Sequence, residues 1–186
     1  MPRTGLAGPA VVATAADLAD EVGFANLTMG LLAERLGIRT PSLYKHVDGL
    51  ADLQHRIAVL AMTQLGDLVR DAIGGHSGRA ALAALATAFR RFVTDHPGRY
   101  NATVGAVVNG PDDPLHLAGG RVLEAIAAVL RGYGIPADQT DHALRTLRSL
   151  LHGFATLQAA GGFQRSADPD ETFEWLIGFV DRGLRP

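Results

Sequence analysis

The chain has 186 residues, with 17 Lys and Arg against 19 Asp and Glu, no cysteine, 47% hydrophobic residues and 19% charged residues. This composition argues against intrinsic disorder and excludes disulfide scaffolds, Cys-ligated metal sites and thiol catalysis. A net charge of −2 gives no bulk attraction to nucleic acid or to an anionic membrane, so a polyanionic partner needs a local arrangement of cations. No segment is long and apolar enough to span a bilayer, and we expect a cytoplasmic protein without a membrane partner.

Gly and Pro residues divide the chain into helical segments, and no sustained period-two alternation indicates a strand. The sequence therefore predicts an all-α fold. The first helix is expected from Pro9 to Gly23, and its apolar stripe argues against a cleaved signal peptide ending near residue 16. A second runs from a Thr28 cap to Gly37. Later helices are expected over 78–95, 101–108, 115–132, 137–160 and 169–183.

A third short helix is expected from Thr40-Pro41 to Val47, with the Thr40 hydroxyl as its cap, followed by a long helix from Leu50 to Gly74. We place the boundary between a small N-terminal domain, residues 1–60, and a larger helical domain, residues 61–186, within this long helix. The helix would then belong to both domains.

The second and third helices are joined by a turn that begins at Gly37, the arrangement of a helix-turn-helix. Ala33 is small where the two helices cross, Gly37 allows a left-handed turn, and Leu43 falls on the inner face ten positions after Ala33. This leaves hydrogen-bond donors and one aromatic ring outside, as contact with DNA requires. The exposed set is Arg39, Thr40, Ser42, Tyr44, Lys45 and His46.

The alternative interpretation of this segment is an ordinary corner between two helices, with Gly37 as a helix cap and the polar residues merely solvated. The charge count favours that alternative, because residues 1–60 hold five Lys and Arg against six Asp and Glu.

The run GFANLTMGLLAERLGIRTPSLYKHV resembles the N-terminal DNA-binding domain of the tetracycline-repressor family. The shared features are a helix ending in Gly-Phe, Leu-Thr before the second helix, Ala-x-x-Leu-Gly-Ile, and Leu-Tyr-x-His in the recognition helix. Leu151-His152-Gly153 also resembles, more weakly, a Trp-His-Gly mark of one C-terminal subfamily. The resemblance implies a DNA-binding domain at 1–60 and a ligand-binding and dimerisation domain at 61–186.

By the same resemblance, Thr28 would contact a phosphate at the start of the second helix, and Tyr44 and His46 would clamp phosphates. Pro41 would fix the start of the recognition helix and could touch a thymine methyl group. Base-edge or flanking contacts would come from Arg39, Thr40, Ser42 and Lys45. The family usually has a Lys shortly after the recognition helix, and Val47-Asp48-Gly49-Leu50 lacks it, so that phosphate contact would be lost or made by a backbone amide.

The larger domain is expected to bind a small apolar or amphipathic ligand in a cavity with a few polar groups. For each residue the alternative is a plain core position. The candidates are Phe89, Phe92, His96, Tyr100, Val104, His116, Leu147, His152 and Phe154.

The last two helices have broad apolar faces, which indicates a core hairpin or an interface between subunits. We expect them to form a four-helix homodimer interface through Leu150, Phe154, Leu157, Phe173, Leu176, Ile177 and Val180.

We predict no catalytic site, metal site or cofactor. The seven His are scattered, no two being three or four positions apart, and no phosphate loop, HExxH or GxSxG pattern occurs. The leading hypothesis is a homodimeric regulator, most simply a repressor, which binds a palindromic operator and is released by a small-molecule inducer. The alternatives are a helical small-molecule-binding protein without specific DNA binding and, third, a helical enzyme. Lys45 is the single lysine, with Arg39 nearby and Arg3 at the terminus, so we expect a shallow salt dependence of DNA binding.

Overall fold

The computed structural model describes residues 7–185, and every regular element in that range is a helix. Arg3, the terminal cation named with Lys45 and Arg39, lies outside the described residues. The described chain divides into two compact units: residues 7–62 with 96–116 form unit 1, and residues 63–95 with 117–185 form unit 2. The first boundary falls inside helix α4 (Leu50–Ile73), so this helix belongs to both units.

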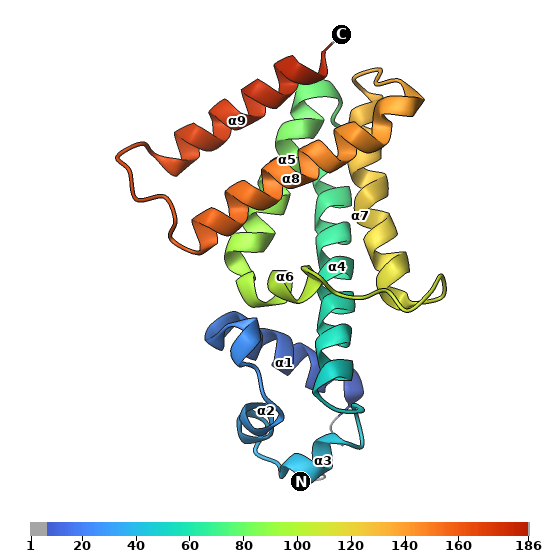
Figure 1. The fold of residues 1–186 in the computed structure, drawn as a ribbon, viewed down its shortest axis with the longest axis vertical. Coiled ribbons are helices and arrows are strands. Elements are labelled where there is room, and N and C mark those ends of the chain that lie inside the picture. The colour runs from blue at the N-terminus through green and yellow to red at the C-terminus, as the bar shows by residue number, and fades with distance from the viewer. Residues whose placement is uncertain (1–6, 186) are drawn as a thin grey trace. The chain divides into compact units, whose positions relative to one another are not determined.

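Unit 1 is built around an apolar core in which Val11, Leu32, Leu43, Leu53 and Ile57 are fully buried. Figure 1 shows its first three α-helices, in blue, beside the start of α4. Its further elements are α1 (Gly8–Val22), the 3-10 turn η1 (Phe24–Asn26), α2 (Met29–Arg35), α3 (Thr40–Leu43) and α6 (Pro97–Thr103).

The ends of α1 and α2 follow from local chemistry, and both helices lie within two residues of the predicted bounds. Pro9 lies in the first turn of α1, where its missing N–H costs nothing, and Gly23 ends the helix with φ 87°. The Thr28 hydroxyl caps α2 by accepting the Leu31 N–H at 3.2 Å.

The third helix is shorter than predicted. It ends at Leu43, and residues 44–46 form a turn in which the His46 and Val47 N–H groups both donate to the Leu43 carbonyl. The Thr40 hydroxyl does not cap it, because Arg39 occupies the cap position and no side chain accepts a hydrogen bond there. The expected Thr40 cap was therefore wrong, since Thr40 already has helical backbone geometry.

The predicted helix over 101–108 was wrong in position. The helix begins at Pro97, whose ring suits the first turn, and ends at Thr103 because Val104 has extended geometry. Residues 96–116 pack in unit 1 rather than with the rest of the expected larger domain. The physical cause is the contact between α6 and α1: the buried Arg99 side chain pairs with Asp17 and with Asp20.

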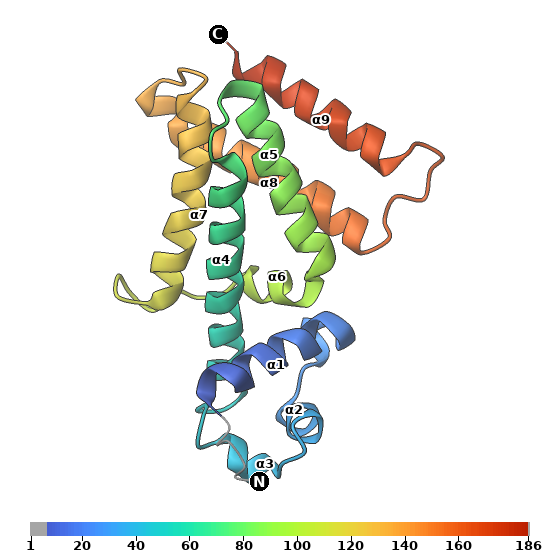
Figure 2. The same cartoon turned by 180° about the vertical axis from the view of Figure 1, so that it is seen from behind.

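Unit 2 is a layered set of helices in which α8 packs across α5, and α9 packs against both. Figure 2 shows α8 and α9 beside α5 from behind. Leu82, Leu85, Leu130, Leu147 and Ile177 are fully buried in it. Its elements are α5 (Gly78–Asp95), α7 (Pro114–Arg131, which starts in unit 1), the 3-10 turn η2 (Ala137–Gln139), α8 (Thr140–Ala159) and α9 (Pro169–Leu184). Across residues 7–185, no helix combines the length and apolar character needed to cross a membrane.

Candidate nucleic-acid interface

The turn between α2 and α3 has the backbone geometry of a helix-turn-helix. Gly37 adopts φ 65°, a left-handed conformation that a side chain would strain. Its N–H donates to the Glu34 carbonyl, and the next N–H, of Ile38, reaches back to the Ala33 carbonyl at 3.0 Å. These two bonds close the end of α2 and turn the chain into α3.

The segment from Arg39 to Val47 has one buried side and one exposed side. Leu43 and Val47 are buried in the core of unit 1, whereas the Tyr44 ring is 56% exposed. Among the predicted DNA contacts, Thr28, Arg39, Pro41, Tyr44 and Lys45 are exposed, and Thr40, Ser42 and His46 are half-buried. The structure thus brings the predicted residues of 39–46 onto one short exposed element.

A clamp of two side chains from α4 holds the end of this element, and sequence reasoning missed it. Asp52 accepts the Asp48 N–H at 2.8 Å and pairs with Arg56, whose guanidinium also donates to the His46 carbonyl at 3.1 Å. Burial raises the pKa of Asp52, but the hydrogen bonds from Arg56 and the Asp48 amide outweigh it, and the pKa lies below its usual value. The Asp52–Arg56 spacing of four, typical of a helix ion pair, was the available signal.

The cations of this region divide into paired and free groups. Arg35 forms two hydrogen bonds with the Glu21 carboxylate, at 2.9 and 2.5 Å, and Arg56 is held by Asp52. Within residues 7–62, Arg39 and Lys45 make no ion pair. The positive charge available to a polyanion is therefore concentrated on the exposed element.

Comparison with known proteins agrees with this geometry. Residues 11–49 match the family model described as bacterial regulatory proteins, tetR family, and residues 82–180 match the model of a tetracyclin repressor-like C-terminal domain. An uncharacterized HTH-type transcriptional regulator of Bacillus subtilis, YobS, is 33% identical over 98% of this chain and 95% of its own length. The chain belongs to the tetR family. It is a TetR-type DNA-binding transcriptional regulator, in a family of regulators rather than enzymes.

Two solved structures share the fold of this tetR-family chain. BioQ with its double-stranded DNA operator has a TM-score of 0.67 at 21% identity, over 95% of this chain and 96% of that one. A TetR variant from Acinetobacter baumannii in complex with minocycline has a TM-score of 0.70 at 24% identity, over 94% of both chains.

The predicted ligand-binding residues of this tetR-family regulator are divided between the units. His96, Tyr100, Val104 and His116 belong to unit 1, and Phe89, Phe92, Leu147, His152 and Phe154 belong to unit 2. Val104 lines a cavity of about 530 Å³ in unit 1, and Leu147 lines a different cavity of about 410 Å³ in unit 2. These two predicted ligand-binding residues therefore do not line the same cavity. His96 donates through Nδ1 to the Asp20 carboxylate at 3.1 Å.

The predicted dimer residues also fall into two groups. Leu157 is 54% exposed, and Leu150 and Leu176 are half-buried, whereas Phe154, Phe173, Ile177 and Val180 are buried within the protomer. Phe154 and Phe173 pack with ring centroids 5.0 Å apart, and Arg90 lies over both rings.

Two exposed aromatic residues of α9 are absent from the predicted dimer residues. Trp175 is 64% exposed and Phe179 is 51% exposed, and their rings stack with centroids 5.5 Å apart. Their spacing of four on one helix was the available signal. Among residues 7–185, no group of three or more His, Asp and Glu side chains is placed to hold a metal ion.

Proposed function

We propose that this tetR-family regulator is a homodimeric repressor that binds a palindromic operator and leaves it when a small molecule binds. The observation that carries this proposal is the exposed element 39–46. Its Arg39, Tyr44 and Lys45 side chains are exposed to solvent, whereas Leu43 is buried in the core of unit 1. We assign DNA binding to residues 1–60, ligand binding and dimerisation to residues 61–186, and the cytoplasm as the location.

On operator DNA, α3 and the turn after it enter the major groove. Arg39 and Lys45 supply the charge, and Thr40, Ser42 and Pro41 lie close enough in the chain to meet base edges. Tyr44 and His46 hold phosphates, which positions the helix without reading sequence. The Thr28 hydroxyl accepts from Leu31 and keeps its own proton to donate to a phosphate oxygen.

Dimerisation through α8 and α9 makes the operator palindromic, because a two-fold axis repeats the same contacts on both half-sites. The stacked and exposed pair Trp175 and Phe179, together with the exposed Leu157 of α8, supports this interface, since contiguous exposed apolar surface marks interaction sites. Figure 2 shows α9 with one side away from α5.

Ligand response is supported by the fold shared with the minocycline-bound TetR variant. The inducer would be a small apolar or amphipathic molecule, and Phe89, Phe92 and His152 are candidate contacts in unit 2. Such a ligand shifts the protein away from the DNA-binding conformation by its difference in affinity for the two conformations.

The test is binding of the purified protein to the DNA upstream of its own gene, measured by fluorescence anisotropy at low salt. We expect specific binding by a dimer. A folded dimer that binds this DNA no better than a scrambled sequence contradicts the proposal and favours a small-molecule-binding protein without specific DNA binding.

A further inference from the structure

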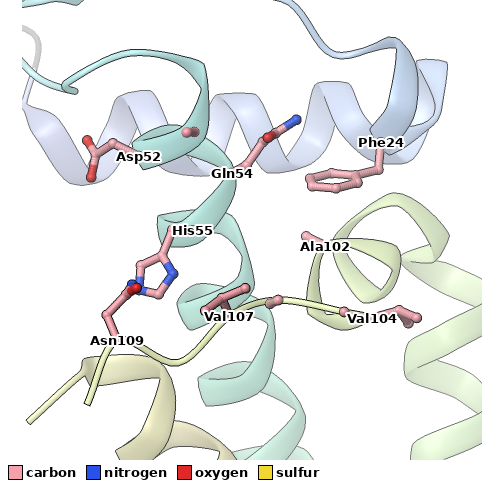
Figure 3. A pocket seen from close by; sticks show the side chains of 11 residues that line it. Phe24, Asp52, Gln54, His55, Ala102, Val104, Val107 and Asn109 are labelled. Atoms are coloured by element: carbon pink, nitrogen blue, oxygen red, sulfur yellow. The ribbon is translucent and has the colours of Figure 1, made fainter.

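A cavity lies within unit 1, and one of the predicted ligand-binding residues, Val104, lines it. Its volume is about 530 Å³, within the range of small-molecule sites. Figure 3 shows Phe24 on one side of it and His55 on the other. The other lining residues come from the first turns of α4, from the end of α6 and from the segment after it: Ala51, Asp52, Gln54, Ala102, Val104, Gly105, Ala106, Val107 and Asn109.

The walls of this cavity are mostly apolar, with one fixed polar group. The His55 ring bonds through Nε2 to the Asp113 carboxylate at 2.9 Å. Asp113 also accepts hydrogen bonds from the backbone N–H groups of Asn109 and Leu115. These two hydrogen bonds hold the pKa of Asp113 below its usual value, and the one from Asn109 has the larger effect. Because a carboxylate only accepts, Nε2 donates to Asp113, and Nδ1 is the ring nitrogen that this bond leaves for a ligand.

The charge around the cavity favours some ligands over others. Asp52 lines it, Asp113 lies behind His55, and no Lys or Arg is among the lining residues. A carboxylate or phosphate ligand would meet repulsion and no cationic partner, whereas a neutral or cationic molecule would avoid that repulsion.

The cavity touches the clamp that holds the DNA-binding element. Asp52 is both a lining residue and the acceptor of the Asp48 N–H, and it orients Arg56 toward the His46 carbonyl. A ligand donor at Asp52 shares the carboxylate with Arg56 and the Asp48 amide, and so weakens or displaces one of these hydrogen bonds. Either change alters the hydrogen bonds at the end of the element 39–46.

We propose that this cavity is a second effector site, located in the DNA-binding unit, for a flat neutral or singly cationic molecule that carries an N–H or O–H donor. Its aromatic body packs on Phe24 and Val107, and its donor meets His55 Nδ1 or Asp52. Its effect on operator affinity rests on the proposed function, whereas its occupancy does not.

Occupancy is tested on the full-length dimer with three indoles that differ in charge: tryptamine, tryptophol and indole-3-acetate. We expect tryptamine and tryptophol to shift the backbone amide NMR signals of Gly105, Val107 and Asn109, and indole-3-acetate to bind at least tenfold more weakly. Equal binding of all three, or shifts confined to unit 2, overturns the site.

Variants separate this site from nonspecific binding. Ala51→Trp fills the cavity from an exposed position and should abolish the shifts, and Ala80→Trp, on an exposed position of α5, should keep them. His55→Gln keeps a donor for Asp113 but lacks an acceptor at the Nδ1 position, so it should weaken tryptophol binding at least threefold, and His55→Asn should restore part of the affinity. Shifts that persist in Ala51→Trp overturn the proposal.

The regulatory step is tested by the operator affinity with and without saturating tryptamine. We expect at least a threefold change in the wild type and a ratio close to one in Asp52→Asn, whatever the basal affinity of that variant. Binding of tryptamine without any change in operator affinity overturns the regulatory step. A protein that binds no operator at all contradicts the proposed function, and the NMR result still decides the site.

Discussion

Gly98 in α6 lies directly against the backbone of Ala19 in α1. A Cβ on Gly98 would stand 2.5 Å from the amide nitrogen of Asp20 and closer still to the Ala19 carbonyl. Hydrogen bonds to the Asp20 carboxylate flank the glycine and hold this close approach. The Arg99 N–H donates to this carboxylate at 2.8 Å, and His96 contacts it from the other side of Gly98 in the chain. The absence of a side chain at residue 98 therefore lets α6 join unit 1.

Gly98→Ala should lower the free energy of unfolding of the protein by about 1–3 kcal/mol, because backbone atoms cannot move aside for a methyl group as a side-chain end can. The measurement is urea unfolding followed by circular dichroism. Gly119→Ala is the matched control: nothing lies within 4 Å of its Cβ position inside α7, so stability should rise by about 0.5–1 kcal/mol. Equal effects of the two substitutions would show that helix propensity alone decides them.

Tyr44→Phe and Lys45→Ala should each weaken operator binding by about 1–3 kcal/mol, because both side chains are exposed on the proposed contact element. The measurement is fluorescence anisotropy with labelled operator. Arg91→Ala is the charge-matched control, since this side chain of α5 is 75% exposed and far along the chain from the element. Unchanged affinity in both test variants would reject the placement of the element on DNA.

Operator binding should depend weakly on salt. Arg39 and Lys45 are the cations of residues 7–62 without an ion pair, which makes four phosphate contacts in a dimer. The logarithm of the binding constant should fall with the logarithm of salt concentration at a slope of about −4. A slope near −10, measured between 50 and 300 mM salt by titration, would reveal a basic surface outside this element.

Asp113→Asn should make stability less sensitive to acid. The pKa of Asp113 is held below its ordinary value of 3.8, chiefly by the N–H groups of Asn109 and Leu115, so its charge stabilises the folded state above that pH. This contribution is lost as the pH falls through the folded-state pKa. The variant should be less stable than the wild type at pH 7, and the two should converge below about pH 4. A stability difference that is constant from pH 7 to pH 3 would contradict this.

Trp175→Asp should convert the proposed dimer to a folded monomer, because the ring is exposed in the protomer and a charge buried in an interface is costly. Sedimentation velocity gives the mass, and circular dichroism gives the fold. Leu117→Asp, at a 60% exposed position of α7, is the control that should remain dimeric. Phe173→Asp should unfold the chain, since Phe173 is buried within the protomer. Dimers of Trp175→Asp would place the interface elsewhere.

The helix-turn-helix was predictable because its requirements are local. A capping hydroxyl at Thr28, a left-handed Gly37 and buried residues at 33 and 43 follow from backbone geometry and spacing, and each lies within a few residues of its partner. The exposed donors of 39–46 follow by elimination once Leu43 and Val47 are assigned to the core.

The sequence by itself determined the all-helical fold, the long helix from Leu50 and the identity of the exposed element, because helix periodicity and caps are encoded over short distances. Only the tertiary structure decided where α6 begins, that residues 96–116 pack with the first helix, and which apolar residues of α8 and α9 stay exposed. Those outcomes depend on partners that are distant in sequence: Gly98 with Ala19, His55 with Asp113, and Phe154 with Phe173. A periodic pattern shows that a face is buried, but not what covers it.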